Sequence, residues 1–321
     1  MHALYWLALF FLFIFSGFRY EVGCDWKTYS LIFQYDLTAN NALSQLSGEF
    51  LYLGLMQLLH EFDLSFRSLN IATSFLFFFG LSSLARREIN PLSFLVLAFP
   101  ILILNLPMSG IRQAVAVGFI CLAINSFVDK KLIKFLTLVF LGAMFHSSAI
   151  IFILLAPFVH GNFSVKNILV ALILSLPVIW VIYTSGLIDI ITVRYLDSGL
   201  DSIGALYRLS ILSITGLFFL IYLSPMWKRL YPHDYKIVHI GSWMMLFCIA
   251  LIPLSSVIAD RIGFYLIPFQ LMIFSRMPYF DTKYDKLLSV LPYLGLSLVF
   301  LVWTQTSYIF NRCYVPYIFN I

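Results

Sequence analysis

Four short polar motifs interrupt an otherwise apolar chain, and they hold the side chains that could do chemistry. Their sequences are Arg19-Tyr20-Glu21-Val22-Gly23-Cys24-Asp25-Trp26, Gly110-Ile111-Arg112-Gln113, Phe145-His146-Ser147-Ser148-Ala149 and Asp260-Arg261. A charge in or near hydrocarbon costs about 3 kcal/mol or more, so such residues usually face a water-filled cavity or a partner. The rigid donor fork of arginine matches carboxylate and phosphate oxygens. The motifs therefore predict a site for an anionic substrate at a membrane.

Arg112 and Gln113 are expected to open a helix, because Pro107 and Gly110 break the apolar run before them. A helix N-terminus carries partial positive charge and free N–H donors. Combined with a guanidinium, it forms a good receptor for phosphate or pyrophosphate. The alternative is an arginine whose side chain extends to lipid headgroups.

Asp260 and Arg261 begin another apolar run, with Tyr265 one helical turn further on, so that Arg261 and Tyr265 share a face. Arg261 is a second candidate for binding an anion. The alternative is that Asp260 and Arg261 only neutralise each other. Arg194 and Arg208 flank the second long polar stretch, where a surface charge costs little.

His146 is embedded in strongly apolar sequence beside Ser147 and Ser148. Its side chain either serves as a hydrogen-bonded structural group or moves a proton and donates to an oxyanion. The chain contains no H-x-x-H or H-E-x-x-H spacing. We therefore expect neither a metal site nor a cofactor.

Asp25, Trp26 and Tyr29 place a carboxylate and two aromatic rings in one polar segment. Aromatic rings stack on the apolar faces of sugars, and a carboxylate accepts hydrogen bonds from sugar hydroxyls or acts on one as a general base. The competing explanation for the rings is the aromatic belt at the membrane interface. Glu49 stands at the start of the next apolar run, where a carboxylate favours a helix N-terminus.

The composition identifies the class of protein. Of 321 residues, 61% are hydrophobic and 11% are charged, about half the charge of a soluble domain. Most stretches between polar breaks approach the length of about 20 residues that spans a bilayer. We predict an all-α, polytopic integral membrane protein with about ten transmembrane helices and outer-face loops, forming a single domain over residues 1–321. The net charge of +5 is scattered over short loops, which argues against a nucleic-acid partner.

The orientation in the membrane follows from basic residues in short loops. The clusters predicted to be cytoplasmic are Arg86-Arg87, Lys130-Lys131-Lys134 and Lys228-Arg229-Lys236. One span separates Arg112 from each of the first two clusters, so Arg112 is expected at the outer face. Residues 132–159 hold one long span or two short ones, with His146 in the middle. A broken or re-entrant helix there would reconcile the count, since irregular backbone is tolerated where it lines a cavity.

Two further expectations concern the N-terminal segment and the cysteines. The apolar segment from Tyr5 to Phe18 lacks a preceding basic region and a following cleavage site, so we interpret it as a retained helix. The four cysteines show no metal-binding spacing, and three lie in or beside apolar segments. They are interpreted as buried, inert thiols; they are Cys24, Cys121, Cys248 and Cys313.

Taken in order, the motifs resemble the EpsG family, a branch of the Wzy-type polysaccharide polymerases. The resemblance covers nearly the whole chain and rests on the order and spacing of short pieces. These are Arg19-Tyr20-x-x-Gly23-x-Asp25-Trp26-x-x-Tyr29, Gly48-Glu49-Phe50, Gly110-Ile111-Arg112-Gln113-x-x-Ala116, His146-Ser147-Ser148-Ala149, Asp260-Arg261-x-x-x-Tyr265 and Tyr314-Val315-Pro316-Tyr317. Cys24 stands where the family often has Thr.

The resemblance implies a glycosyltransferase that polymerises undecaprenyl-pyrophosphate-linked oligosaccharide repeat units for O-antigen, capsule or exopolysaccharide. The growing glycan would be transferred from its lipid pyrophosphate onto an incoming unit, at the periplasmic face of the bacterial inner membrane. A chain-length regulator is an implied partner, and no metal is implied.

The resemblance also distributes roles among the candidate residues. The pyrophosphate would be bound by Arg112, Arg261, Arg19 and Arg194. The sugars would be bound by Trp26, Tyr29, Gln113 and Tyr265. Asp25 is the first choice for the base that accepts the proton of the acceptor hydroxyl, and His146 is the second. The alternatives are a flippase or transporter of the lipid-linked oligosaccharide, an acyltransferase that modifies surface polysaccharide, and an O-antigen ligase.

Overall fold

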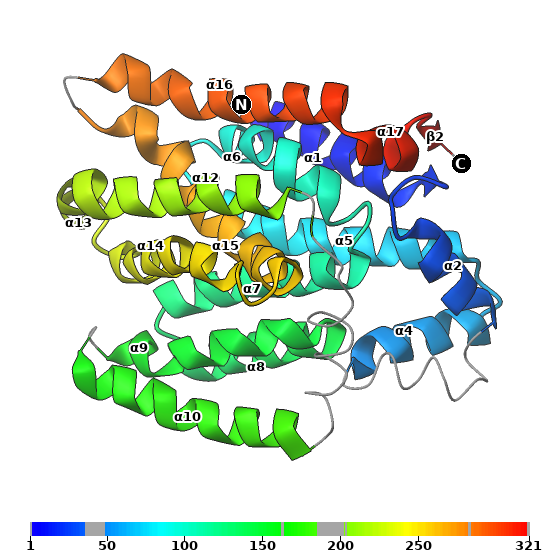
Figure 1. Cartoon of the computed structure of the whole chain (residues 1–321), viewed down its shortest axis with the longest axis horizontal. Coiled ribbons are helices and arrows are strands. Elements are labelled where there is room, and N and C mark those ends of the chain that lie inside the picture. Colours follow the sequence, from blue (N-terminus) through cyan, green and yellow to red (C-terminus); the bar gives the residue numbers. More distant parts are fainter. Residues whose placement is uncertain are drawn as a thin grey trace. The chain divides into compact units, whose positions relative to one another are not determined.

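The computed structural model describes residues 2–35, 49–161, 164–184, 202, 204–281 and 284–319, and almost all of its regular structure is helical (Figure 1). The α-helices are α1 (His2–Gly17), α2 (Trp26–Tyr35), α4 (Phe50–Glu61), α5 (Phe66–Ala85), α6 (Pro91–Ala98), α7 (Ile111–Val128), α8 (Leu132–Phe145), α9 (Ala156–His160), α10 (Val165–Thr184), α12 (Ala205–Phe218), α13 (Ser224–Leu230), α14 (Tyr235–Cys248), α15 (Ser256–Arg276), α16 (Asp285–Thr306) and α17 (Tyr308–Tyr314). The predicted all-α class is confirmed.

The lengths and apolar character of these helices are those of a multi-pass membrane protein. In the described part of the chain, five helical stretches are long and apolar enough to cross a bilayer, and six shorter apolar helices accompany them. The long ones are Phe66–Ala85, Ile111–Val128, Ala205–Leu230, Ser256–Tyr279 and Asp285–Thr306. These long and shorter apolar helices are of the kind expected for the predicted polytopic protein with about ten transmembrane helices.

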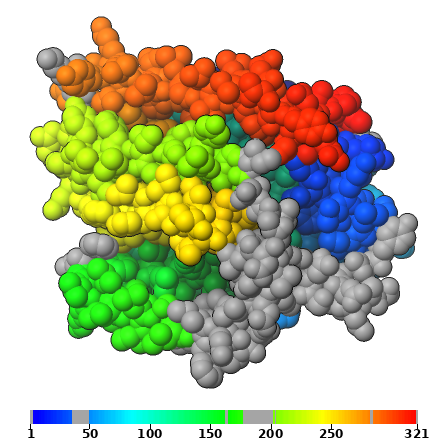
Figure 2. Space-filling view, in the orientation of Figure 1, coloured from blue at the N-terminus to red at the C-terminus, as the bar shows by residue number. Residues whose placement is uncertain are grey.

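Helix α16 illustrates the surface expected against lipid. Its exposed side chains are apolar along most of its length, among them Leu287, Leu291, Leu294, Leu298 and Leu301. Figure 2 shows this helix, in orange, lying open on the surface. An extended apolar surface without charge is stable against hydrocarbon but not against water.

The described residues form two compact units. The first comprises Met1–Leu122, Leu138–Ile150 and Phe274–Ile321, and the second comprises Ala123–Thr137 and Ile151–Ile273. The single domain over residues 1–321 stays a prediction.

Small residues bring the helices of the first unit close together. Helices α1 and α5 lie side by side (Figure 1), and α5 meets α7 where Gly80 faces Gly118. A Cβ on Gly80 would lie 2.0 Å from the carbonyl oxygen of Gly118. Gly142 of α8 approaches α7 less closely, because its Cβ would lie 3.2 Å from the Cβ of Phe119. Glycine thus allows the backbones to pack at distances that a side chain would prevent.

The two ends of the first unit are joined by a structure that we call the terminal clasp. Strand β1 (Arg19–Tyr20) pairs antiparallel with β2 (Ile318–Phe319), and Cys24 forms a disulfide with Cys313. The interpretation of all four cysteines as inert thiols is therefore wrong for this pair. Only Cys121 and Cys248, both buried, are free thiols in the described chain.

The terminal clasp also holds the turn that leads into α7. Gly23 has a φ of +107°, and a Cβ there would lie 1.9 Å from the carbonyl oxygen of Met108. The Ser109 hydroxyl accepts a hydrogen bond from the Cys24 N–H at 2.8 Å and lies 3.1 Å from the Tyr314 hydroxyl. Segments from both ends of the chain therefore fix the start of the helix that carries Arg112.

The apolar stretch over residues 132–159 is broken, as predicted. Helix α8 ends at Phe145, and a 3₁₀ segment, Ser147–Leu155, follows before α9. His146 stands at the break, with its N–H donating to the Gly142 carbonyl at 2.9 Å. The imidazole of His146 is hydrogen-bonded to Glu49 of the same unit.

Candidate functional site

A carboxylate, a guanidinium and an imidazole meet in the first unit. One oxygen of Glu49 (Oε2) lies 2.5 Å from Nη1 of Arg112, and the other (Oε1) lies 2.7 Å from Nδ1 of His146. All three side chains are largely buried, with exposed fractions of 6%, 18% and 8% respectively. Because the three residues are far apart in sequence, only the fold brings them together.

Glu49 is the N-cap residue of α4, but its side chain makes no capping hydrogen bond. The interpretation that Glu49 simply favours a helix N-terminus therefore does not account for its carboxylate. The backbone carbonyl of Glu49 accepts the N–H groups of Tyr52 and Leu53, each at 3.1 Å. The helix start thus fixes the backbone, and the carboxylate is used to hold Arg112 and His146.

Arg112 is the second residue of α7, at the helix start that the sequence predicted. Its Nε donates to the Tyr29 hydroxyl at 3.2 Å, and its guanidinium carbon lies 5.5 Å and 5.8 Å from the ring centres of Tyr29 and Tyr52. A guanidinium has five N–H donors. The contacts of Arg112 to described residues use Nε and Nη1, so donors on Nη2 remain for an anion at this helix N-terminus.

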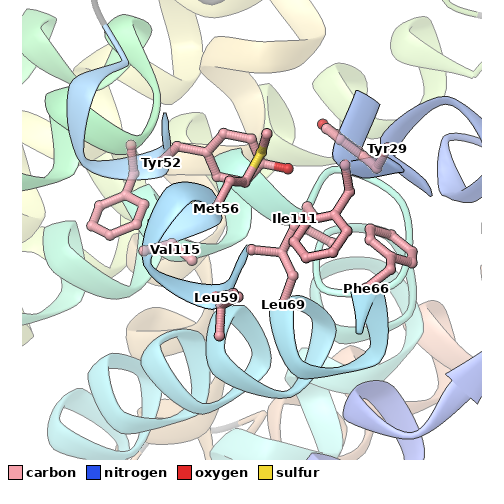
Figure 3. Close-up of a cluster of buried hydrophobic side chains, with 10 residues drawn as sticks. Tyr29, Tyr52, Met56, Leu59, Phe66, Leu69, Ile111 and Val115 are labelled. Carbon is pink, nitrogen blue, oxygen red and sulfur yellow. The ribbon is translucent and has the colours of Figure 1, made fainter. Parts of the chain in front are cut away.

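An apolar cluster holds these elements in register. Figure 3 shows Tyr29, Tyr52 and Met56 with Ile111 and Val115, and all five are buried. Tyr29 comes from α2, Tyr52 and Met56 from α4, and the last two from α7. The packing fixes the start of α4 against the start of α7, and so it fixes Glu49 relative to Arg112. Phe145 stacks on Phe119 of α7 with ring centres 5.7 Å apart, which holds the adjacent His146 against the same helix.

The electrostatics of the cluster favour an ionised Glu49. Burial raises the pKa of this carboxyl, but the hydrogen bond from His146 and the positive charge of Arg112 outweigh burial and bring the pKa below its usual value. Burial also raises the pKa of the Tyr29 and Tyr52 hydroxyls. Both phenols therefore stay neutral around the ion pair.

The Tyr52 hydroxyl is a further polar group of this cluster. The residue is 0% exposed, and its oxygen has no hydrogen-bond partner among the described residues. A buried hydroxyl without a partner is costly. Together with the remaining donors of Arg112, it adds hydrogen-bonding capacity beside the guanidinium.

Arg19 is placed differently from Arg112. It is 2% exposed, and its guanidinium donates to the carbonyls of Ser16, Val22 and Met108 and to the Asn70 side chain at 3.0 Å. Burial lowers the pKa of Arg19 to about 10. These contacts tie the terminal clasp to α5. The role of Arg19 in binding pyrophosphate stays a prediction, and its contacts favour a structural role.

The predicted base Asp25 and the predicted sugar-binding residues are spread through both units. Asp25 is exposed directly before α2, whereas Trp26 packs edge-on against Tyr20 and Phe66 with ring centres 5.2 Å and 5.3 Å away. Gln113 follows Arg112 on α7 and is buried. Tyr265 is buried in the second unit, 5.7 Å from the ring of Phe152. Of this set, Tyr29 is the one that contacts Arg112.

The second unit contains an arginine–carboxylate pair that the sequence did not indicate. Asp260 accepts hydrogen bonds from Arg208, from Nε at 2.8 Å and from Nη2 at 2.6 Å, and from the Ser202 hydroxyl at 2.7 Å. The idea that Asp260 and Arg261 neutralise each other is therefore replaced by a pairing with Arg208. Arg261 is half-buried on α15, and Arg194 lies outside the described residues.

Sequence reasoning missed Glu49, Tyr52 and Arg208 as members of these networks. A signal for Glu49 was present, because a carboxylate at the start of an apolar run requires a buried cation or donor. In the part of the chain that the structure describes, no three metal-ligating side chains converge.

Comparison with known proteins adds one match. A family model described as the EpsG family matches residues 2–319. No curated protein and no solved structure matches the chain.

Proposed function

Because the chain belongs to the EpsG family, which is associated with exopolysaccharide biosynthesis, we propose that it polymerises lipid-linked oligosaccharide repeat units. In this reaction the growing glycan is transferred from undecaprenyl pyrophosphate to the non-reducing end of an incoming lipid-linked unit. The anomeric carbon exchanges its bond to pyrophosphate for a bond to the acceptor oxygen. The site therefore has to stabilise a leaving anion and to remove a proton from a hydroxyl.

The observation that carries this proposal is the arrangement of Arg112. Its guanidinium stands at the N-terminus of a long apolar helix, where the backbone also favours an anion. It is held by one bond to Glu49 and one to Tyr29, so its position is fixed while donors remain. Arg261 and Arg194 are further candidates for the pyrophosphate.

The orientation of the site is part of the proposal. Disulfides persist in oxidising compartments and are rare in the cytoplasm. The Cys24–Cys313 bond lies in the terminal clasp, which contacts the turn before Arg112. This supports a periplasmic or extracellular position for the start of α7, in agreement with the distribution of basic loops.

Deletion of the gene, followed by gel analysis of surface polysaccharide and of lipid-linked intermediates, tests the proposal. Loss of a polymerase leaves single repeat units on their acceptors and removes the ladder of longer chains. Restoration of the ladder by the wild-type gene would assign the effect to this protein.

Three other results would overturn the proposal, and each favours a different activity. Repeat units that stay on the cytoplasmic side favour a flippase. A normal ladder that has lost acyl groups favours an acyltransferase. Polymer that remains on its lipid carrier favours a ligase.

A further inference from the structure

We propose that Glu49 and His146 form a carboxylate–histidine dyad that accepts the proton of the acceptor hydroxyl, with Glu49 positioning both His146 and Arg112. This inference rests on the proposed polymerase function. It names the proton acceptor, and it gives Glu49 a role in the reaction.

The hydrogen-bond chemistry of the dyad defines the state of the imidazole. An ionised carboxylate only accepts hydrogen bonds, so Nδ1 of His146 must donate to Oε1 of Glu49 at 2.7 Å. In neutral imidazole the other ring nitrogen, Nε2, then carries the lone pair. Carboxylates hold catalytic histidines in this tautomer in unrelated enzymes. Glu49 thus fixes which nitrogen of His146 is basic.

The second oxygen of Glu49 connects proton transfer to anion binding. Oε2 accepts from Nη1 of Arg112, and the two carboxylate oxygens belong to one rigid plane. A movement of Glu49 therefore disturbs the imidazole and the guanidinium together. Since Glu49 contacts both side chains and is itself 4% exposed, it acts as a positioning residue.

The charges around His146 suit a proton acceptor. Among the described residues, Glu49 places a negative charge and Arg112 a positive charge in this cluster, and the neutral phenols of Tyr29 and Tyr52 lie against Arg112. Proton uptake by the imidazole adds one positive charge, next to the place where a leaving anion would be bound.

The proposed step balances in atoms and charge. The acceptor hydroxyl oxygen forms the bond to the anomeric carbon, and the bond from that carbon to the pyrophosphate oxygen breaks. The electron pair of the broken bond leaves with pyrophosphate, which Arg112 stabilises. The hydroxyl proton moves to Nε2 of His146, and Glu49 stabilises the resulting imidazolium. Release of this proton to water restores the starting state.

Asp25, the first choice from sequence, is less suited to this role. Its side chain is exposed, whereas His146 is buried and is held by the hydrogen bond to Glu49. A base that is fixed in position loses less freedom in the transition state than an exposed side chain.

The test is the rate of polymer formation as a function of pH, measured on purified protein in lipid nanodiscs with lipid-linked repeat units from a deletion strain. The variants are His146→Gln, Glu49→Gln and Glu49→Asp. The matched controls are His60→Gln and Glu61→Gln on α4. His60 is hydrogen-bonded to the carbonyl of Phe33, and Glu61 is exposed.

In the wild-type protein, protonation of His146 should reduce the rate at low pH. His146→Gln should lower the rate about 100-fold or more and remove this acid limb. Glu49→Gln should lower the rate about 10-fold or more and move the limb to lower pH, because the imidazolium loses a neighbouring negative charge. Glu49→Asp should recover part of the rate, and the controls should behave as the wild type.

A purely structural role for Glu49 would reduce folded protein without moving the acid limb. Folded protein is measured by size-exclusion chromatography, and Glu49→Asp serves if Glu49→Gln does not fold. If wild type polymerises and the variants keep its acid limb, the dyad is overturned and the proposed function stands. If wild type makes no polymer, both are overturned.

Discussion

Two arginine–carboxylate pairs of this protein, Arg112–Glu49 and Arg208–Asp260, are built on the same plan, but with different numbers of hydrogen bonds between the guanidinium and the carboxylate. Arg112 and Arg208 each lie in the first turn of an apolar helix, and each meets a carboxylate from another element. Each also lies near an aromatic ring, Tyr29 in one case and Phe264 in the other. The shared plan reflects the need to neutralise a cation at the end of an apolar helix.

The difference lies in how the guanidinium is used. Arg208 donates hydrogen bonds from both Nε and Nη2 to Asp260, so this pair is bidentate. Arg112 gives only Nη1 to Glu49, and the second oxygen of Glu49 is taken by His146. A bidentate pair holds geometry well, whereas Arg112 divides its donors between Glu49 and Tyr29 and leaves those on Nη2 for a ligand. We therefore interpret the Arg208 network as a structural ion pair, which we call the brace, and the Arg112 network as a binding site for an anion.

The largest effect should come from Arg112→Ala. Loss of a positioned donor to a developing anion costs about 100-fold or more in rate, so the variant should form almost no polymer although it inserts in the membrane. Arg208→Ala should reduce the amount of folded protein but keep the rate per folded molecule within about threefold. Rates are measured by polymer formation and are normalised to folded protein by size-exclusion chromatography.

The lysine variants sharpen the same comparison. Arg112→Lys keeps the charge but loses the planar fork, so a marked loss of rate is expected. Arg208→Lys is the matched control and should keep the wild-type rate per folded molecule. An equal loss of rate per folded molecule in Arg208→Lys would show that both arginines act in the reaction, and the distinction between brace and site would be wrong.

A second prediction concerns the terminal clasp, a covalent link in the first unit. A double variant, Cys24→Ser with Cys313→Ser, should lose about 2–3 kcal/mol of stability, because the disulfide restricts the chain ends in the unfolded state. Thermal unfolding of the purified protein measures this loss. A reducing agent should lower the unfolding temperature of the wild type to that of the double variant and leave the double variant unchanged. No response of the wild type would mean that the clasp is held by β1, β2 and Gly23 alone.

Local features of the sequence were sufficient to predict much of the fold. Apolar length predicted the membrane helices, Pro107 and Gly110 predicted the start of α7, and the count of spans between basic clusters predicted the break near His146. The first two of these predictions depend on residues that are close in sequence. Helix starts and breaks are decided locally, by capping, missing N–H groups and the loss of apolar periodicity.

The pairing of side chains could not be predicted in the same way. Glu49 and His146 are 97 residues apart, and Cys24 and Cys313 are 289 apart, so only the packed helices bring them together. The adjacent pair Asp260 and Arg261 was misleading for a geometric reason. Neighbours on a helix point in directions about 100° apart and do not face each other. Asp260 therefore finds its partner on another helix.

The third prediction addresses the brace. Asp260→Asn keeps the size of the side chain and removes its charge, so the Arg208 fork loses a charge-assisted pair. Because both side chains are partly exposed, at 21% and 13%, the expected loss of stability is about 1–2 kcal/mol, between the values for surface and buried pairs. Thermal unfolding measures this loss. A double variant with Arg208→Gln should lose little more than Asp260→Asn alone, and full additivity would show that the two side chains do not depend on each other.

The smallest expected effect is the response of the first network to acid, and its sign follows from Glu49. The folded state holds the pKa of Glu49 below its usual value, so the unfolded chain binds the proton at a higher pH than the folded protein does. Ionised Glu49 then stabilises the fold above the ordinary carboxyl pKa, and this contribution disappears as the pH falls through the lowered value. Between about pH 7 and about pH 4, Glu49→Gln should lose about 1–2 °C less in unfolding temperature than the wild type. Glu61→Gln, which changes an exposed carboxyl on the same helix, should follow the wild type. An acid response in Glu49→Gln as large as that of the wild type would place the titrating group elsewhere, and Glu49 would then be a brace like Asp260.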